Sequence, residues 1–162
     1  MKNTILRFIS IFGITMLLFS CFGTVHKLVV DPYTPAEQTV PITFISDTGD
    51  GSFVLKKWNN VDIYNNVYGE KTVWSTDDTK LDVPAGDNTF LMDVRYSSNS
   101  YSVNMPGIEL RYTLEAGKKY EVKGIVKSSG FAFFKTNEFF IGIYDVTKKS
   151  TLLKEWKLLG TK

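Results

Sequence analysis

The sequence predicts an all-β protein folded as a single antiparallel β-sandwich, and three observations lead to this prediction. Between residues 79 and 127 apolar and polar residues alternate with a period of two, which is the spacing of a strand buried on one face. Short turns containing Gly, Asn and Pro separate the alternating runs, and such turns join antiparallel neighbours. Each run has one apolar face, so a second layer must cover it.

Four alternating runs are predicted to form one antiparallel meander around which the chain is organised. They cover residues 79–83, 90–96, 108–114 and 120–127. In the third run every even-numbered residue is apolar and every odd-numbered residue is polar, whereas a helix would mix the two kinds on one face. The sequences PAGDN at 84–88 and EAGK at 115–118 are the predicted turns, because Pro restricts φ and Gly and Asn tolerate positive φ.

The chain before the meander is predicted to contribute strands at 26–30, 39–46 and 52–58. Pro41 indicates a strand at a sheet edge, because proline has no N–H to donate to a neighbour. Asn65-Asn66 indicates a two-residue hairpin, since Asn accepts the positive φ that such turns require.

The chain after the meander is predicted to form a hairpin, with residues 131–135 and 138–146 flanking a turn at Thr136-Asn137. Residues 151–159 close the chain as a strand, although their apolar spacing also fits a short amphipathic helix, so 152–159 is left as strand or helix. Roughly nine strands with regular turns and no splitting linker favour one sandwich domain.

The N-terminus has the organisation of a secretory signal peptide. Lys2 and Arg7 precede an uncharged apolar run of 13 residues at 8–20, which is shorter than the roughly 20 residues that a membrane-spanning helix needs. The predicted organisation is a signal-peptide helix within residues 1–20, an anchor linker and first strand over 21–38, and a sandwich domain over 39–162.

The only cysteine, Cys21, follows this apolar run directly. The sequence Leu18-Phe19-Ser20-Cys21 resembles the lipobox of bacterial lipoproteins, in which a signal peptidase cuts before Cys and a diacylglycerol is attached to its sulfur. Phe19 departs from the usual small residue at its position. The resemblance implies a protein of the bacterial cell envelope that is anchored to the membrane through lipidated Cys21 and faces the periplasm or the surface. Phe22, in place of the Asp that some families use for inner-membrane retention, favours the outer membrane.

A second resemblance concerns the sandwich itself. Val83-Pro84-Ala85-Gly86 at the end of a strand, and LEAGKKY at 114–120, are similar to PEGA-type β-sandwich domains and to related small bacterial lipoproteins of uncharacterised function. The similarity covers roughly residues 61–126, and the tetrapeptide PEGA itself is absent. It implies a compact immunoglobulin- or transthyretin-like sandwich and no catalytic residues.

The charge balance argues against nucleic acid as a partner. The chain has a net charge of +2, and both surplus charges are Lys2 and Arg7 of the signal peptide. The remaining 17 basic and 17 acidic residues cancel. Nucleic-acid binding requires a concentrated basic surface, so we exclude that class of partner.

Residue types that carry catalysis or bind metals are interpreted as structural. His26 is the only histidine, so neither a Ser-His-Asp triad nor a Cys-His pair nor a histidine-based zinc site is expected. Asp47-Thr48-Gly49 is the tripeptide of aspartic proteases, but those enzymes need two facing aspartates. Asp50, Asp77 and Asp78 lack the alternating pattern of a calcium loop and are interpreted as turn residues. We therefore expect no enzyme, no metal and no cofactor.

Aromatic and amide side chains in or beside the predicted loops form the candidate ligand-binding set. Its aromatic members are Trp58, Tyr64, Tyr68, Trp74 and Tyr101. Aromatic faces combined with amide partners suit a sugar or a peptide, because they combine stacking with hydrogen bonds. The alternative is that these rings cap the ends of the sandwich core, since large aromatic side chains are mostly buried.

These observations predict a non-catalytic, lipid-anchored envelope protein that acts as a binding or structural module. Its partner is expected to be an envelope protein, a cell-wall component or a glycan. One alternative is a carbohydrate-binding or adhesin module that uses the loops rich in Asn and aromatic residues. A second alternative is a hydrolase, against which the missing nucleophile motif argues.

Overall fold

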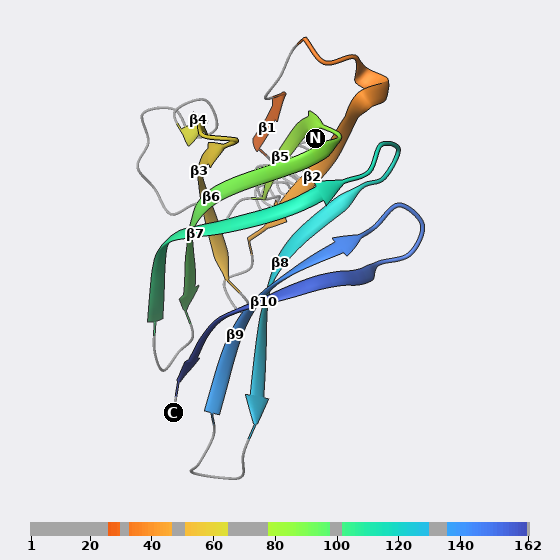
Figure 1. Cartoon of the computed structure of the whole chain (residues 1–162). Coiled ribbons are helices and arrows are strands. Elements are labelled where there is room, and N and C mark those ends of the chain that lie inside the picture. The colour runs from red at the N-terminus through yellow and green to blue at the C-terminus, as the bar shows by residue number, and fades with distance from the viewer. Residues whose placement is uncertain are drawn as a thin grey trace, which may run out of the picture.

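The computed structural model describes residues 26–29, 33–46, 51–64, 78–97, 102–129 and 136–161. Within these residues two β-sheets pack against each other around one apolar core (Figure 1). The predicted all-β sandwich is therefore confirmed.

The larger sheet has six described strands in the spatial order β1-β5-β2-β8-β9-β10. Their bounds are β1 His26–Val29, β2 Thr39–Ile45, β5 Thr79–Pro84, β8 Tyr120–Ser129, β9 Thr136–Asp145 and β10 Thr151–Thr161. The pairs β1–β5 and β2–β8 are parallel and the other pairs are antiparallel, so this sheet is mixed and not wholly antiparallel as predicted. Both parallel pairs join strands that are distant in the sequence, and turn composition carries no information about such pairs.

The smaller sheet has four described strands in the order β4-β3-β6-β7, all antiparallel. Their bounds are β3 Ser52–Trp58, β4 Val61–Asp62, β6 Gly86–Ser97 and β7 Ser102–Leu114. A 3-10 helix at Ala36–Gln38 leads into β2. Strand β7 is the last described strand of the smaller sheet, and β10 is the last described strand of the larger sheet. The two strands lie on the same side of the sandwich, where Tyr112 of β7 contacts Trp156 of β10.

The core consists of alternate residues from the inner faces of both sheets. Its side chains of no more than 1% exposure include Val40, Ile42, Phe44, Leu55, Leu81, Val83, Phe90, Met92, Tyr120, Val122, Ile141 and Ile143. Phe44 of β2 joins the layers, with its ring 6.1 Å from that of Phe53 and 5.3 Å from that of Phe90 in edge-on contacts. The alternation in the sequence thus identified the inner faces correctly.

The two Ala-Gly sequences do not join neighbouring strands of one sheet, as the meander prediction required. The first leads from β5 in the larger sheet to β6 in the smaller, and the second leads from β7 in the smaller to β8 in the larger. Gly86 and Gly117 have φ of +109° and +77°, which glycine adopts at little cost. The predicted meander is therefore two pairs of strands in different layers, because corners and hairpin turns use the same residue types.

Tyr120 holds the second corner, which is the connection from β7 in the smaller sheet to β8 in the larger sheet. Its phenol is 1% exposed, and its oxygen accepts a hydrogen bond of 3.0 Å from the backbone N–H of Glu115. Burial raises the pKa of Tyr120 above its usual value. Lys118 lies 3.0 Å from the carboxylate of Glu115 and 3.5 Å from that of Asp145, which ties the corner to the end of β9.

Two hairpins differ from the predictions. Asn59 and Asn60, with φ of 44° and 67°, form the turn between β3 and β4. The hairpin predicted at 65–66 lies outside the described residues. Thr136 and Asn137 belong to β9, so the turn predicted there is wrong.

Two other predictions on strands are settled. Residues 152–159 lie within β10, so the strand prediction is confirmed and the helix alternative is wrong. Strand β2 lies between β5 and β8, so the edge predicted from Pro41 is also wrong. Its pairing with β8 begins only at Ile42, and for this reason the missing N–H of Pro41 is tolerated inside the sheet.

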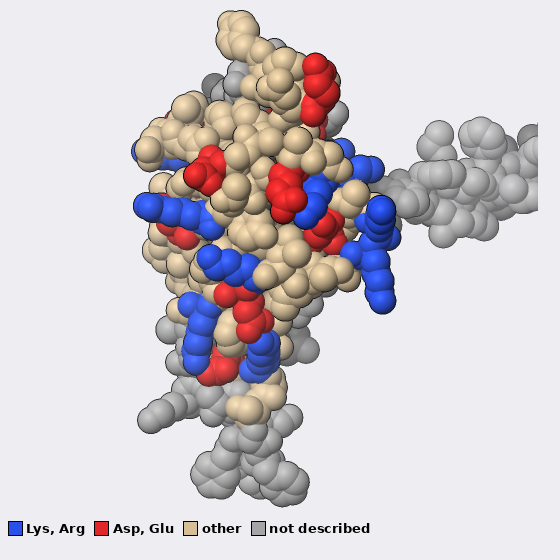
Figure 2. All heavy atoms as spheres, turned by 45° about the vertical axis from the view of Figure 1, so that its right-hand side comes forward, with Lys and Arg blue, Asp and Glu red and all other residues tan. Residues whose placement is uncertain are grey.

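The outer face of β8, β9 and β10 carries matched charges. The Lys127 ammonium lies 2.7 Å from the Glu155 carboxylate, and Lys157 pairs with Glu138. Lys127 also sits 4.4 Å above the ring of Phe140. Figure 2 shows the same interleaving of basic and acidic side chains over the described surface that faces the viewer, with no broad area of one sign.

Candidate functional site

The candidate ligand-binding set from the sequence is described only in part. Trp58 and Tyr64 are partly buried and pack against the core. The Trp58 indole N–H donates to Asn88 Oδ1 at 2.6 Å, and the Lys56 ammonium lies 4.5 Å from the Tyr64 ring centroid. Both rings therefore have structural contacts, and their role in binding stays a prediction.

Several other predicted positions lie outside the described residues. They are Cys21, Asp47, Asp50, Tyr68, Trp74, Asp77 and Tyr101. Asp78 is described, and its carboxylate accepts the Ser46 backbone N–H at 2.9 Å. The backbone of His26 begins β1.

The described residues contain neither a cluster of metal ligands nor a helix able to span a membrane. No group of three or more His, Cys, Asp or Glu side chains among them is placed to hold a metal ion. No helix among them combines the length and the apolar character that crossing a membrane requires.

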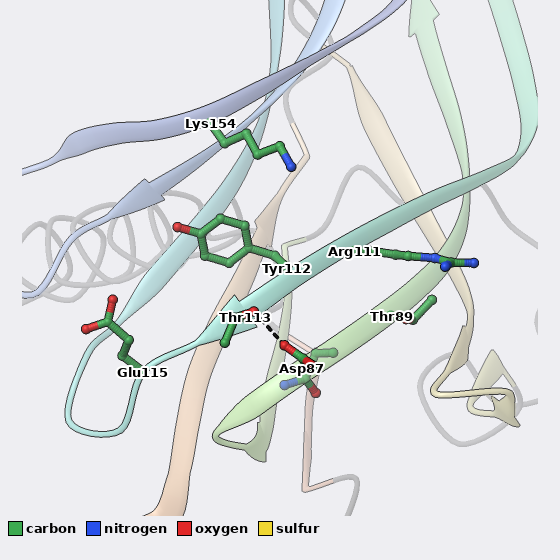
Figure 3. Close-up of a pocket in the computed structure, with 8 residues that line it drawn as sticks. Asp87, Thr89, Arg111, Tyr112, Thr113, Glu115 and Lys154 are labelled. Carbon is green, nitrogen blue, oxygen red and sulfur yellow. Dashed lines mark hydrogen bonds between the residues drawn. The ribbon is translucent and has the colours of Figure 1, made fainter.

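A polar hollow of about 680 Å³ lies along β7, the last strand of the smaller sheet in the described order (Figure 3). It is lined by Asp87, Asn88, Thr89, Arg111, Tyr112, Thr113, Glu115 and Lys154. Consecutive residues of a strand point to opposite faces, and residues 111, 112 and 113 all line the hollow. It therefore straddles the edge at which β7 ends the smaller sheet among the described strands, and we name it the edge hollow.

The register between β6 and β7 explains the polar wall of the edge hollow. Asp87 pairs with Thr113, and Thr89 pairs with Arg111, so these four side chains project side by side from the outer face. The Thr113 hydroxyl donates to Asp87 Oδ1 at 2.5 Å. Arg111 donates from Nε to Glu109 on the same face, and this hydrogen bond raises the pKa of the guanidinium.

An aromatic residue borders the hollow on the other face of β7. Tyr112 makes edge-on contacts with Tyr120 at 6.1 Å and with Trp156 at 6.3 Å between ring centroids, which fix the ring. Lys154 of β10 lies 4.8 Å from the Trp156 ring centroid, and Figure 3 shows its ammonium extending over the space above Tyr112. The hollow thus combines a held aromatic ring with charged and hydroxyl groups.

Asn88 lies on the inner face of β6, behind the polar side chains that line the edge hollow. Its side chain is 3% exposed, and its amide nitrogen donates to the carbonyl oxygens of Pro84 at 3.0 Å and Gly86 at 2.9 Å. Its amide oxygen accepts the Trp58 indole N–H. The first corner and the start of β6 are therefore held rigidly behind the hollow.

A smaller hollow of about 350 Å³ lies at the turn between β9 and β10 and is lined by Lys118, Asp145, Thr147, Lys148, Lys149 and Thr151. Its acidic group is already occupied, because Asp145 accepts the Thr147 backbone N–H at 2.9 Å and pairs with Lys118. Hydrogen bonds from Thr147 lower the pKa of Asp145 below its usual value. These contacts shape the turn.

No family model, curated protein or solved structure matches this chain. The resemblances to lipoproteins and to PEGA-type sandwiches therefore stay predictions.

The edge hollow is suited to binding a polar ligand of low net charge. Two acidic residues, Asp87 and Glu115, and two basic residues, Arg111 and Lys154, line it in balance. Its size lies within the range of about 300 to 1,000 Å³ that small-ligand sites usually have.

Sequence reasoning missed this site. It assigned Thr89, Arg111 and Thr113 to the polar faces of strands, which is correct, but polarity alone indicates solvent. The pairing of Asp87 with Thr113 depends on cross-strand register, whereas the sequence predicts a turn at Asp87. The approach of Lys154 from β10 depends on the packing of two sheets, which no local pattern shows.

Proposed function

We propose that this chain is a non-catalytic, lipid-anchored protein of the bacterial cell envelope, whose sandwich acts as a binding or structural module at the membrane. The observation that carries the proposal is the sequence LFSC, which ends an apolar run at Cys21. This resembles a lipobox, and the outer membrane is the favoured location because Phe22 follows the cysteine.

The short distance between anchor and fold supports a role close to the membrane. Strand β1 begins at His26, five residues after Cys21. A fully extended chain of that length spans at most about 18 Å. A lipid on Cys21 would hold the larger sheet within reach of lipid headgroups and of components attached to the same membrane.

A binding role accords better than catalysis with the groups in the structure. The described charged groups with displaced pKa values are Arg111, Lys118 and Asp145, and each is displaced mainly by a hydrogen bond to a neighbouring side chain. Catalytic groups are usually tuned by burial beside a reacting centre. The single histidine, His26, supplies no partner for a nucleophile.

Lipid attachment is tested by metabolic labelling of cells with a fatty acid that carries a clickable tag. We expect the wild-type protein to take up the label and to sediment with membranes, and Cys21→Ala to lose the label. Ser20→Ala is the matched control, since it keeps a small residue before the cysteine and should stay labelled. Equal labelling of wild type and Cys21→Ala, or none in the wild type at normal abundance, contradicts the proposal.

A carbohydrate-binding role is the second candidate. The edge hollow favours it, because a held aromatic ring beside hydroxyl, carboxylate and guanidinium groups is a combination that recognises sugars. The loop residues chosen from the sequence are not needed for this candidate.

A further inference from the structure

We propose that the edge hollow is the ligand site of the module and that it binds a neutral oligosaccharide across the edge of β7. This inference rests on the binding role proposed above. It assigns the site to the wall formed by β6 and β7 and to Lys154 of β10, a different place from the aromatic loops.

Charge balance selects a neutral ligand. Asp87 and Glu115 offset Arg111 and Lys154 around the hollow, and Glu109 further offsets Arg111. A polyanion such as nucleic acid or a sulfated glycan gains affinity from a surplus of cations, and the lining has none. A cationic ligand finds no surplus of acidic lining residues, since Asp87 and Glu115 are matched by Arg111 and Lys154. A ligand with many hydroxyls and no charge needs no such surplus, because its hydroxyls can bond to acidic and basic groups alike.

The outer wall offers donors and acceptors at the spacing of neighbouring side chains on paired strands. Cβ atoms of directly paired residues lie about 4.5 to 5.5 Å apart. Asp87 beside Thr113, and Thr89 beside Arg111, therefore present a carboxylate, two hydroxyls and a guanidinium in one cluster. Sugar hydroxyls both donate and accept, so adjacent hydroxyls of one ring can be bound by such mixed groups. Hydrogen bonds to the charged members are the stronger ones.

Tyr112 provides the apolar part of the site. The C–H face of a sugar ring packs on an aromatic ring, and Tyr combines this with a hydroxyl. Contacts with Tyr120 and Trp156 already fix the ring of Tyr112, so little side-chain freedom is lost on binding. Figure 3 shows Tyr112 between Lys154 and Thr113.

A peptide strand is the other occupant that the edge of a sheet can accept. Charged side chains at an edge oppose added strands, and Arg111 and Lys154 flank the relevant part of β7. Pro106 removes one backbone donor from the same strand. These features favour the oligosaccharide.

The test is titration calorimetry with the full-length protein purified in lauryldimethylamine oxide, because detergents with sugar headgroups would compete for the site. The probes are maltohexaose, cellohexaose and chitohexaose as neutral chains and a heparin hexasaccharide as an anionic chain. We expect at least one neutral hexamer to bind and heparin not to bind. Asp87→Ala and Arg111→Ala should each weaken the binding about tenfold or more, since each loses hydrogen bonds to a charged group.

The matched controls are Glu37→Ala and Lys57→Ala, which remove exposed charges outside the hollow and should leave affinity unchanged. Tyr112→Phe keeps the ring and should retain most of the affinity, whereas Tyr112→Leu should lose it. The proposal is overturned if no neutral hexamer binds at millimolar concentration, if only heparin binds, or if the hollow variants bind like the controls. Displacement of the bound hexamer by an unstructured peptide at equal affinity would overturn it in favour of strand pairing. Fatty-acid labelling of Cys21 is unaffected by any of these outcomes, so the two proposals fail separately.

Discussion

The two outer faces of this sandwich differ, although the same alternation of polar and apolar residues builds both. On β8, β9 and β10 the opposite charges meet across strands, as Lys127 does with Glu155 and Lys157 with Glu138. On β6 and β7 the cross-strand neighbours are a carboxylate with a hydroxyl and a hydroxyl with a guanidinium, and the surface beside them is hollowed. The two faces are therefore equally polar but differ in kind. On β8, β9 and β10 the charges neutralise each other across the strands, whereas the groups on β6 and β7 have capacity for further hydrogen bonds.

The largest expected loss of stability tests whether Asn88 holds the start of β6 in place behind the edge hollow. Asn88→Ala removes three hydrogen bonds and leaves the Trp58 indole N–H without its acceptor. We expect the free energy of unfolding to fall by about 2 to 4 kcal/mol, because a buried polar group that loses its partner costs more than the bond is worth. Urea unfolding followed by tryptophan fluorescence measures the change.

Asn104→Ala is the control for this variant, since Asn104 is an exposed residue of β7 and should cost less than about 0.5 kcal/mol. Equal losses for the two variants would mean that the start of β6 is not held by Asn88, and the contrast between the two faces would lose its structural basis.

An intermediate effect is expected on the other face, at Gly142 of β9. A Cβ there would lie 2.6 Å from Ile125 Cδ1, 3.0 Å from Tyr144 Cε2 and 3.1 Å from Leu152 Cδ1. Two of these atoms are the ends of side chains that can shift in part, so we expect Gly142→Val to destabilise by about 1 to 3 kcal/mol. Oligosaccharide affinity should not change, because the edge hollow does not include this face.

Combining Gly142→Val with Ile125→Ala sharpens this prediction, since the smaller side chain removes the shortest contact. The double variant should recover part of the loss, and strictly additive losses would show that the clash with Ile125 is not the cause.

The smallest effect is expected for the ion pairs. Lys127→Met and Glu155→Gln remove a pair whose side chains are 48% and 34% exposed. Exposed pairs contribute about 0 to 1 kcal/mol, because solvent and salt screen them. A double-mutant cycle at low and high salt should give a coupling energy in that range that declines with salt. A coupling energy well above about 1 kcal/mol would mean that the ion pairs on β8, β9 and β10 are a main source of stability.

Much of the fold could be predicted from the sequence, because alternation depends on which face is buried. The bounds of β3 were predicted at 52–58, and the inner residues of β6, β7 and β8 were correctly identified. Which sheet each strand joins could not be predicted. Pro84, Gly86 and Gly117 suit a hairpin and a corner equally well, so local composition could not show that the chain changes layers there.

The candidate site was less predictable than the fold for a related reason. The sequence predicts a binding site among aromatic residues near loops, and of these the described Trp58 and Tyr64 pack against the core. The groups of the edge hollow come together through the register of β6 with β7 and through the approach of β10. These are long-range relations, and the local patterns of one sequence carry no signal for them.

The parallel pairing of β1 with β5 would have a mechanical consequence if Cys21 carries the proposed lipid anchor. His26 to Val29 pair with Thr79 to Asp82 in the same direction, and the chain enters β1 from the side of Cys21. A pull on the anchor along the axis of β1 stretches these hydrogen bonds together, in shear, instead of peeling them apart one at a time. Such a joint yields only when several bonds break at once, so β1 would resist being pulled off the sheet by a force on the proposed anchor.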